Sequence, residues 1–574
     1  MVDDKELKQL EQVEEDNISV TDETATMLLD DDADHDAQQQ PSGEVDVDAF
    51  IRHTGNFGRY QILLMIMITI SAFPTSYPVL LFYFIGHGPD WKCTGANSAC
   101  LNVTTHHTPE DTARCHMNRT AWTYSHANKS TIVTEFDLVC DRAWLDALSG
   151  SSAFIGWGIG ILVTGYISDQ YGRKKVMFIC LGAMLVTLMA HYFVTGVWML
   201  IVLRFVMGIF FSAPALLQFL MLVELIAPKY RVIACNICQF AWPVAAGLLV
   251  IKAYYLQSWR TLCLLCSAPY FFVLLTAFFI PESVRWLHTK GRKHAAEEIL
   301  RRVARINRKS LPSNLSLQDF DHTTTLKTKV TYWDMVKQVK ILKQIVAQAF
   351  IWFHCGLTYY ALNWEFADIG GDMYINSILS FLVELPGNIV IIFTLQRFGR
   401  KRMNLIFSAL TTITCLAVAA MPKTEALKTV RLVFGLLGKC FISCLFGGIY
   451  MWSSELFATV TRTQGMAIMV VTSRLGAALS PFIKLLYTFH PSAPFGLMTF
   501  TSITATLLCL TLTETANQKT RETLDDMIGT QVVMTELPVV TDFNDNMNPT
   551  STNPGSVLTY DNEGIMDDEN IVLH

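Results

Sequence analysis

The chain has 574 residues, of which 51% are hydrophobic and only 16% are charged, and its mean hydropathy is +0.33. A composition this apolar excludes an ordinary soluble protein of this length and indicates a membrane protein. The net charge of −6 hides an asymmetry, because acidic residues gather at both ends of the sequence and basic residues gather between them.

The two ends of the sequence predict disordered acidic tails. Residues 1–50 carry 17 acidic and 2 basic side chains, and residues 515–574 carry 11 and 2; neither segment shows apolar periodicity. The segment after Met1 also lacks the positive and apolar regions of a cleaved signal peptide. We therefore expect the first membrane span to direct insertion.

Between the tails, twelve apolar stretches have the length of about 20 residues that crosses a bilayer. They lie near 60–86, 144–168, 176–196, 198–224, 232–256 and 260–280, and then near 342–364, 372–396, 403–421, 428–452, 463–487 and 493–514. Spanning segments must satisfy their own backbone, so we expect helices. Seven prolines inside these stretches predict kinks or local unwinding, namely Pro74, Pro78, Pro214, Pro243, Pro269, Pro386 and Pro481.

The segment 87–143, after the first span, has the chemistry of an extracellular loop. Its three sequons predict N-glycosylation at Asn102, Asn118 and Asn128. Its four cysteines, Cys93, Cys100, Cys115 and Cys140, predict two disulfide bonds in an oxidising compartment, with three pairings open.

Two copies of one unit are visible in the sequence. Gly172-Arg-Lys-Lys recurs as Gly399-Arg-Lys-Arg, and each glycine is followed 32 residues later by an arginine, Arg204 or Arg431. Glu-Leu-x-Ala-x-x-x-Arg occurs at Glu224 to Arg231 and again at Glu455 to Arg462. We therefore expect an all-α membrane protein with two six-helix pseudo-repeats, over 51–280 and 342–514, a transporter architecture.

Basic residues indicate the orientation, since Lys and Arg collect in cytoplasmic loops. The repeated motifs and the linker 281–341 are basic, whereas the opposite short connections carry few basic residues. Both tails are then cytoplasmic, and the loop 87–143 faces outward. The linker itself predicts short surface helices near anionic lipid headgroups.

The repeated motifs also predict gating residues. Acidic and basic residues at cytoplasmic helix ends can form ion pairs that hold the two halves closed; the alternative is a static role in topology. The candidates are Asp169, Arg173, Glu224, Arg231, Arg400, Glu455 and Arg462.

Ionisable residues at mid-depth are the candidates for substrate binding, because a charge there costs about 2.5–3.5 kcal/mol or more. Glu384, Lys439 and Arg474 lie about halfway along their spans. The guanidinium of Arg474 suits a carboxylate or sulfonate and repels an ammonium group; the alternative is that Arg474 or Lys439 pairs with Glu384 inside the fold. Lys484, nearer the outer end of its span, can reach the membrane surface.

Aromatic residues add a second feature of the candidate site. Trp352 and Tyr359 are seven residues apart on one predicted helix, followed by Tyr360, and therefore lie on roughly one face. Such a wall can stack on flat molecules and attract ammonium groups; the alternative is packing between helices.

The sequence contains no phosphate-binding loop of an ATP-driven pump, no convincing metal site and no catalytic constellation. We expect no cofactor, no metal, no enzymatic activity and no nucleic-acid partner.

Several motifs in order resemble one transporter family. Asp169-Gln-Tyr-Gly-Arg-Lys-Lys is similar to the signature of the major facilitator superfamily. Phe57-Gly-Arg-Tyr-Gln, Pro281-Glu-Ser-Val-Arg-Trp-Leu and Ser454-Glu-Leu-Phe resemble the organic cation, organic anion and carnitine transporters of solute carrier family 22. The sequence departs from the family at Gln396, Ala458 and Thr513.

The resemblance implies the major facilitator fold and alternating access at the plasma membrane. The stretch from Ser473 to Pro481 resembles the organic anion and carnitine branches, whereas the cation branch typically has an aspartate at the position of Arg474. We expect a transporter of organic anions or zwitterions such as carnitine-like compounds. The alternatives are an organic cation transporter and a non-transporting membrane sensor; the sequence leaves a coupling ion and the oligomeric state open.

Overall fold

The computed structural model describes residues 43–94, 112–125, 130–312, 314–319, 332–368, 372–458, 460–516, 518, 521 and 527. Within these residues, twelve helical segments are long and apolar enough to cross a membrane, and each overlaps one of the twelve predicted stretches. The protein is therefore an all-α membrane protein with twelve candidate spans.

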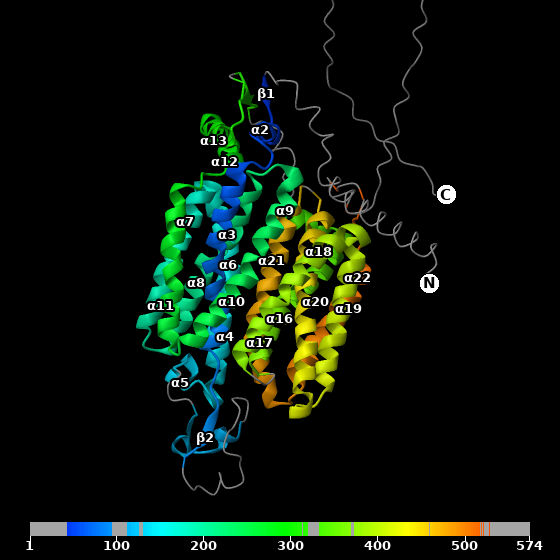
Figure 1. Cartoon of the computed structure of the whole chain (residues 1–574). Coiled ribbons are helices and arrows are strands. Elements are labelled where there is room, and N and C mark those ends of the chain that lie inside the picture. The colour runs from blue at the N-terminus through cyan, green and yellow to red at the C-terminus, as the bar shows by residue number, and fades with distance from the viewer. Residues whose placement is uncertain are drawn as a thin grey trace, which may run out of the picture. The chain divides into compact units, whose positions relative to one another are not determined.

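The spans form two bundles (Figure 1). The first bundle contains α3 (Arg59–Leu80), α4 (Phe82–Ile85), α6 (Ala143–Tyr171), α7 (Arg173–Ala190), α8 (Val197–Val223), α9 (Pro228–Gln239), α10 (Ala241–Tyr255) and α11 (Trp259–Leu275). The second bundle contains α16 (Val339–Asp368), α17 (Met373–Leu382), α18 (Glu384–Phe398), α19 (Arg400–Ala420), α20 (Lys428–Leu456), α21 (Arg462–Leu479) and α22 (Ala493–Thr511). The bundles meet where α6 packs on α21 and α10 packs on α17.

The two ends of the bundles carry different elements. β2 and α5, in the segment 87–143, lie beyond one end, here called the loop end, while α12 and α13 lie at the opposite end, here called the linker end (Figure 1).

Three of the predicted prolines follow breaks between helical segments. α9 ends before Phe240, three residues before Pro243, and α17 ends before Val383, three residues before Pro386. After Leu479, α21 continues as the 3₁₀ helix η10 (Ser480–Thr488), which contains Pro481. The cause is the missing N–H of proline and the clash of its ring with the carbonyl of the preceding turn. The second break places Glu384 at the start of α18.

Helices α16 and α21 cross in close contact, and glycine makes this possible. A Cβ atom on Gly476 would lie 2.1 Å from the carbonyl oxygen of Phe353, and one on Gly356 would lie 2.1 Å from that of Ser473. Side chains at either position would push the helices apart. The crossing brings Arg474 of α21 close to the aromatic residues of α16.

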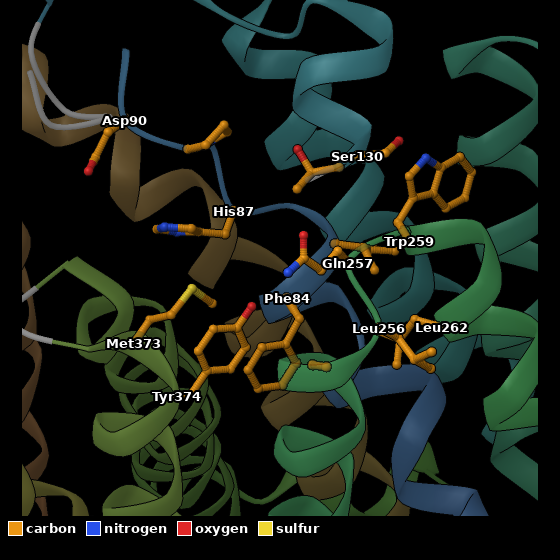
Figure 2. A pocket seen from close by; sticks show the side chains of 14 residues that line it. Phe84, His87, Asp90, Ser130, Leu256, Gln257, Trp259, Leu262, Met373 and Tyr374 are labelled. Carbon is orange, nitrogen blue, oxygen red and sulfur yellow. The ribbon is translucent and has the colours of Figure 1, made fainter. Parts of the chain in front are cut away.

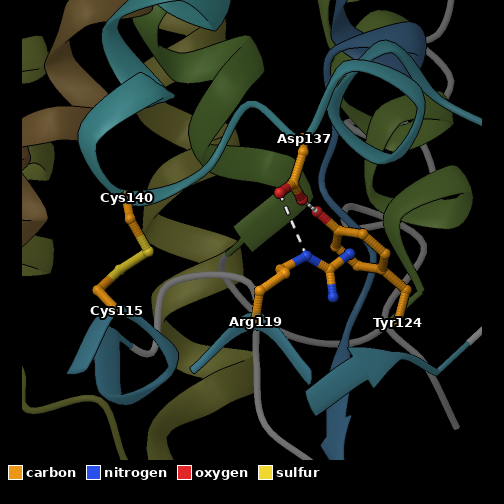
Figure 3. The surroundings of a disulfide bond; sticks show 5 residues. All are labelled: Cys115, Arg119, Tyr124, Asp137 and Cys140. Carbon is orange, nitrogen blue, oxygen red and sulfur yellow. Dashed lines mark hydrogen bonds and ion pairs between the residues drawn. A yellow bond between two sulfur atoms is a disulfide. The ribbon is translucent and has the colours of Figure 1, made fainter. Parts of the chain in front are cut away.

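The described residues of the segment 87–143 form a small folded unit at the loop end. Strands β2 (Trp91–Cys93) and β3 (Trp122–Tyr124) pair antiparallel, and α5 (Ile132–Phe136) follows. Figure 3 shows the disulfide bond between Cys115 and Cys140 beside an ion pair of 3.2 Å between Arg119 and Asp137. The hydroxyl of Tyr124 also donates to Asp137, at 3.1 Å.

The predicted modifications of this loop fall partly outside the described residues. Cys93 is disulfide-bonded, whereas Cys100, Asn102 and Asn128 lie outside the described residues. Asn118 is described and exposed, as a glycosylation site must be.

The prediction that the whole of 1–50 is disordered is wrong for its last residues. β1 (Glu44–Val45) pairs in parallel with β4 (Ser316–Leu317) of the linker, and α2 (Val47–His53) packs on α13 (Lys293–Ile306). Val47, Phe50 and Ile51 are buried there. The prediction was dominated by the acidic composition of residues 1–50, in which the apolar residues of α2 are a small minority.

Asp48 joins this terminal segment to two basic residues. Its carboxylate lies 2.6 Å from Nη2 of Arg231 in α9 and also pairs with Arg285 in α12 (Val284–Thr289). Burial raises the pKa of Asp48, but the two guanidinium groups outweigh this effect and lower it overall. The segment is therefore held by charge as well as by apolar contact.

The linker contains short helices, as expected, but its principal apolar face is occupied by protein. The buried residues of α13 are Ala296, Leu300, Val303 and Ala304, and α13 packs against α2 and α3. This face is therefore not left for lipid. α15 (Tyr332–Lys337) precedes the second bundle.

Candidate substrate site

A buried ion pair occupies mid-depth in the second bundle. Nζ of Lys439 in α20 lies 3.1 Å from Oε1 of Glu384 in α18, and the two side chains are 0% and 6% exposed. The same ammonium donates to the carbonyl of Tyr359 at 3.3 Å and lies 3.2 Å from the centre of its ring. Lys439 therefore pairs inside the fold, which was the alternative to an anion contact.

Tyr359 connects this ion pair to the first bundle. Its hydroxyl donates to Oε1 of Glu384 at 2.9 Å and accepts a bond of 3.0 Å from Nε1 of Trp242 in α10. The chain Trp242–Tyr359–Glu384–Lys439 thus crosses from one bundle to the other. The hydrogen bond between Trp242 and Tyr359 is the link of this chain that crosses the boundary between the bundles.

Arg474 has a different environment from Lys439. Its guanidinium lies 3.4 Å from the ring centre of Trp157 in α6 of the first bundle, and Nη1 donates to the hydroxyl of Tyr360 at 3.4 Å. Its Nε has no hydrogen-bond partner, and no described carboxylate forms an ion pair with it. With 6% of Arg474 exposed, a buried guanidinium without a counter-ion is a strong recognition group for an anion.

The third aromatic candidate, Trp352, belongs to the same network but is fully packed. Its Nε1 donates to Oγ of Ser453 at 2.9 Å, and its ring contacts those of Phe446 and Tyr450. Phe446 in turn stacks on Tyr359. The six predicted residues therefore form one connected set. Trp352 contributes to it by packing, through Phe446, behind Tyr359.

Trp157 and Trp242 contact this set but were not predicted, because the prediction rested on charged residues at mid-depth and on the aromatic residues of one span. A signal for Trp157 exists in the repeat: it stands 15 residues before Gly172, and Glu384 stands 15 residues before Gly399. The two residues hold the same position in the two copies, and each lies against a cation.

At the linker end, the first copy of the motif forms a cluster within the first bundle. Arg173 lies 2.5 Å from Asp169 and 3.6 Å from Glu224. Glu282 accepts from the backbone N–H of Lys174 at 2.9 Å, and Ser283 donates to Glu224. The cluster ties the starts and ends of several helices together.

The second copy repeats this arrangement within the second bundle. Arg400 lies 3.1 Å from Glu455, and Thr515 donates to Glu455 at 2.5 Å. Glu514 accepts from the backbone N–H of Arg400 at 2.8 Å. Burial raises the pKa of Glu514, but backbone N–H groups at Ala516, Lys401, Thr515 and Arg400 outweigh it and lower the pKa overall.

In both copies a glutamate, Glu282 or Glu514, occupies the space that a side chain on the glycine of the motif would need. Gly172 and Gly399 have φ of 109° and 95°, which favours glycine, and a Cβ atom would lie 2.5 Å from Glu282 or 2.6 Å from Glu514. The ion pairs of Arg173 and Arg400 described above stay within one bundle each. These pairs therefore do not themselves join the halves, contrary to the expectation. Arg231 pairs with Asp48, and Arg462 begins α21.

A separate cavity of about 150 Å³ lies at the loop end. Figure 2 shows Phe84, His87 and Gln257 of the first half facing Met373 and Tyr374 of the second. The rings of Phe84 and Tyr374 stack across the boundary, with centroids 6.2 Å apart. The cavity thus marks a point at which the two halves meet, away from the mid-depth residues.

Two six-helix bundles with charged and aromatic residues at mid-depth define a membrane transporter of the major facilitator class, not an enzyme. The chain matches the family model described as "Sugar (and other) transporter" over residues 99–525. The proton:xylose symporter XylE, bound to 6-bromo-6-deoxy-D-glucose, has a similar structure: the TM-score is 0.58 over 82% of this chain and 98% of XylE. At 17% identity, this likeness shows the fold alone.

Curated relatives narrow the class. "Solute carrier family 22 member 15" of Xenopus tropicalis is 31% identical over 70% of this chain and 76% of that protein. "Organic cation transporter protein" of Drosophila melanogaster is 28% identical over 83% and 94%, and human "Solute carrier family 22 member 13" is 29% identical over 82% and 91%. The chain belongs to solute carrier family 22, within the sugar (and other) transporter family, and is a transporter of organic ions.

Proposed function

We propose that this transporter carries small organic anions or zwitterions, such as carnitine-like compounds, by alternating access. The observation that supports this most is the environment of Arg474, whose guanidinium lies on Trp157 without a carboxylate partner among the described residues. The charges of Lys439 and Glu384 cancel in their ion pair. Of the three mid-depth charges, one positive charge therefore remains for a substrate.

The aromatic residues suit the rest of such a substrate. Tyr360 contacts both Arg474 and Phe154 of the first bundle, so aromatic faces lie next to the guanidinium. A zwitterion can place its carboxylate on Arg474 and its ammonium group against a ring, an attraction of about 0.5–2 kcal/mol.

Organic cation transport is the second candidate, and the names of the relatives favour it. Two Drosophila melanogaster relatives are named "Organic cation transporter protein" and "Organic cation transporter-like protein". In this mode Glu384 is the residue that receives the substrate's cationic group, in exchange for Lys439.

Uptake into cells that express the full chain distinguishes these candidates. Labelled carnitine, a planar organic anion and tetraethylammonium are compared in the parent, Arg474→Asp, Arg474→Lys and Glu384→Gln, each corrected for surface expression. Saturable uptake of carnitine or the anion that Arg474→Asp abolishes and Arg474→Lys partly retains supports the proposal.

Uptake of tetraethylammonium alone, lost in Glu384→Gln and indifferent to the Arg474 variants, overturns the anion proposal in favour of cation transport. No uptake of any of the three compounds favours the membrane-sensor alternative.

We also propose that the protein resides in the plasma membrane with its loop end outside and both termini in the cytoplasm. The basic residues of the linker and of the repeated motifs at the linker end support this orientation. Treatment with a glycosidase is expected to shift the mobility of the parent, and Asn118→Gln is expected to reduce that shift. An unglycosylated parent contradicts the orientation.

The linker-end clusters take a related role in this proposal. Arg173, Glu224, Arg400 and Glu455 hold the helices of each half together, so that each half moves as a rigid body. Their role in gating is then to preserve the helix packing within each half while the halves move relative to each other.

A further inference from the structure

Charged residues that the mid-depth site does not use lie at the loop end. Lys484 is in η10 of the second half, where its position predicted an ammonium directed to the membrane surface. In the structure, its Nζ lies 3.5 Å from the carbonyl oxygen of Gly86 and 3.9 Å from Oδ2 of Asp146 in α6. Both partners belong to the first half.

The same ammonium contacts an aromatic cluster that crosses the boundary. Nζ of Lys484 lies 4.0 Å from the ring centre of Trp364 in α16. That ring meets Phe82 and Tyr83 of the first half edge to face, with centroids 5.3 Å and 4.5 Å apart. Lys484 thus contacts the elements of both halves that close the loop end.

Within the described part of the chain, Lys484 is the cation that lies within ion-pair distance of Asp146. Asp146 is 9% exposed, and its Oδ1 has no hydrogen-bond partner. Arg204 also lies near Asp146 but forms no ion pair with it within the described residues: its Nε donates to the carbonyl of Ser149 at 2.8 Å, its guanidinium lies 4.2 Å from the ring centre of Phe82, and its Nη1 has no hydrogen-bond partner. A buried carboxylate without a partner is costly.

Opening of the loop end changes how much Asp146 and Lys484 gain from their contact. When the halves separate there, water can hydrate both the carboxylate and the ammonium, and neither needs the other. The pair therefore stabilises the closed arrangement relative to the open one only while both charges are present.

We propose that Asp146 and Lys484 are the gating pair of the loop end: their contact closes this end, and its release opens it. The proposal rests on alternating access, which is part of the proposed function, but it does not depend on the identity of the substrate.

A cysteine at position 151 reports the state of this end without any substrate. Ser151 of α6 is 1% exposed, and its hydroxyl donates to the carbonyl of Ala478 in the second half. In the purified full chain carrying Ser151→Cys, a hydrophilic maleimide in detergent solution labels this thiol only when the halves separate there; the chain with Ser151 retained gives the background from other cysteines.

Adding Lys484→Met is expected to raise the labelling rate about fivefold or more, a typical size for coupling between states. Asp146→Asn tests the pair from its other side and is expected to give the same increase. Asp146→Lys combined with Lys484→Asp restores the pair with exchanged charges, and its rate is expected to return toward that of the parent.

Lys423→Met is the matched control, because Lys423 lies 3.7 Å from the ring centre of Tyr487, within the second half; its labelling rate is expected to equal the parent's. Parental rates in both single neutral variants overturn the proposal, and so does a charge exchange that labels as fast as they do. Failure of the uptake experiments leaves these rates unaffected, so the two proposals fail separately.

Discussion

The ammonium of Lys439 and the carboxylate of Glu384 lie 3.1 Å apart in a setting where both side chains are almost completely buried. Each charge needs the other there, because removal of one partner leaves an uncompensated buried charge. The pair accordingly has a structural role whatever the substrate is.

Lys439→Met is expected to lower the free energy of unfolding by about 3–5 kcal/mol, measured by thermal unfolding of the purified protein. The double variant Lys439→Met/Glu384→Gln is expected to recover most of this loss, because it leaves no charge behind. A single variant as stable as the parent contradicts the buried pair.

Trp157→Leu is expected to weaken apparent substrate affinity about 2- to 30-fold, which corresponds to the 0.5–2 kcal/mol of a cation–aromatic contact. The ring supports the guanidinium of Arg474 at 3.4 Å, and its loss lets that group move. Trp157→Phe keeps an aromatic face and serves as the control. The KM for uptake is the measurement, and equal values in both variants argue against the contact.

Gly476→Ala is expected to destabilise the protein by about 1–3 kcal/mol, the usual cost of overpacking, because its Cβ would meet the carbonyl of Phe353 at 2.1 Å. Gly182→Ala, where a Cβ meets nothing within 4 Å, is the control. It is expected to be neutral or slightly stabilising, since alanine favours helix. Unfolding temperatures of the two variants decide the matter.

Glu514→Gln is expected to lower the unfolding temperature at neutral pH and to lose this effect in acid. The folded-state pKa of Glu514 lies below its ordinary value of 4.5. The stability that the charged carboxylate adds to the folded state is therefore fully present above about pH 4.5, and it is lost as the pH falls through the lower folded-state pKa. The difference between parent and variant, measured at pH 7 and at pH 4, is expected to shrink. A constant difference contradicts a charged cap.

The sequence was sufficient for the span arrangement because each span is long and apolar, and because the motif at Gly172 recurs at Gly399. It also drew attention to Glu384, Lys439 and Arg474, since charge inside an apolar stretch is conspicuous, and all three are buried in the structure; their binding role stays a prediction. It did not identify which cation Glu384 pairs with, because that depends on how α18 and α20 pack.

Contacts between distant segments account for the remaining misses. Trp157 reaches Arg474 only when the two bundles meet, so its position in the repeat marks the residue but not its contact with Arg474. Asp48 finds Arg231 and Arg285 about 180 and 240 residues away, whereas local composition predicted disorder. Such contacts are properties of the assembled fold and not of any single stretch.

The shared position of Trp157 and Glu384 in the two copies has a consequence for stereochemistry. The copies are alike at their linker ends, yet one places a ring and the other a carboxylate at the same depth. Arg474 on Trp157, the Glu384–Lys439 pair and the ring of Tyr360 are three different contacts, the least number that distinguishes a chiral molecule from its mirror image. A chiral zwitterion and its mirror image cannot both satisfy these contacts equally, so uptake is expected to be enantioselective.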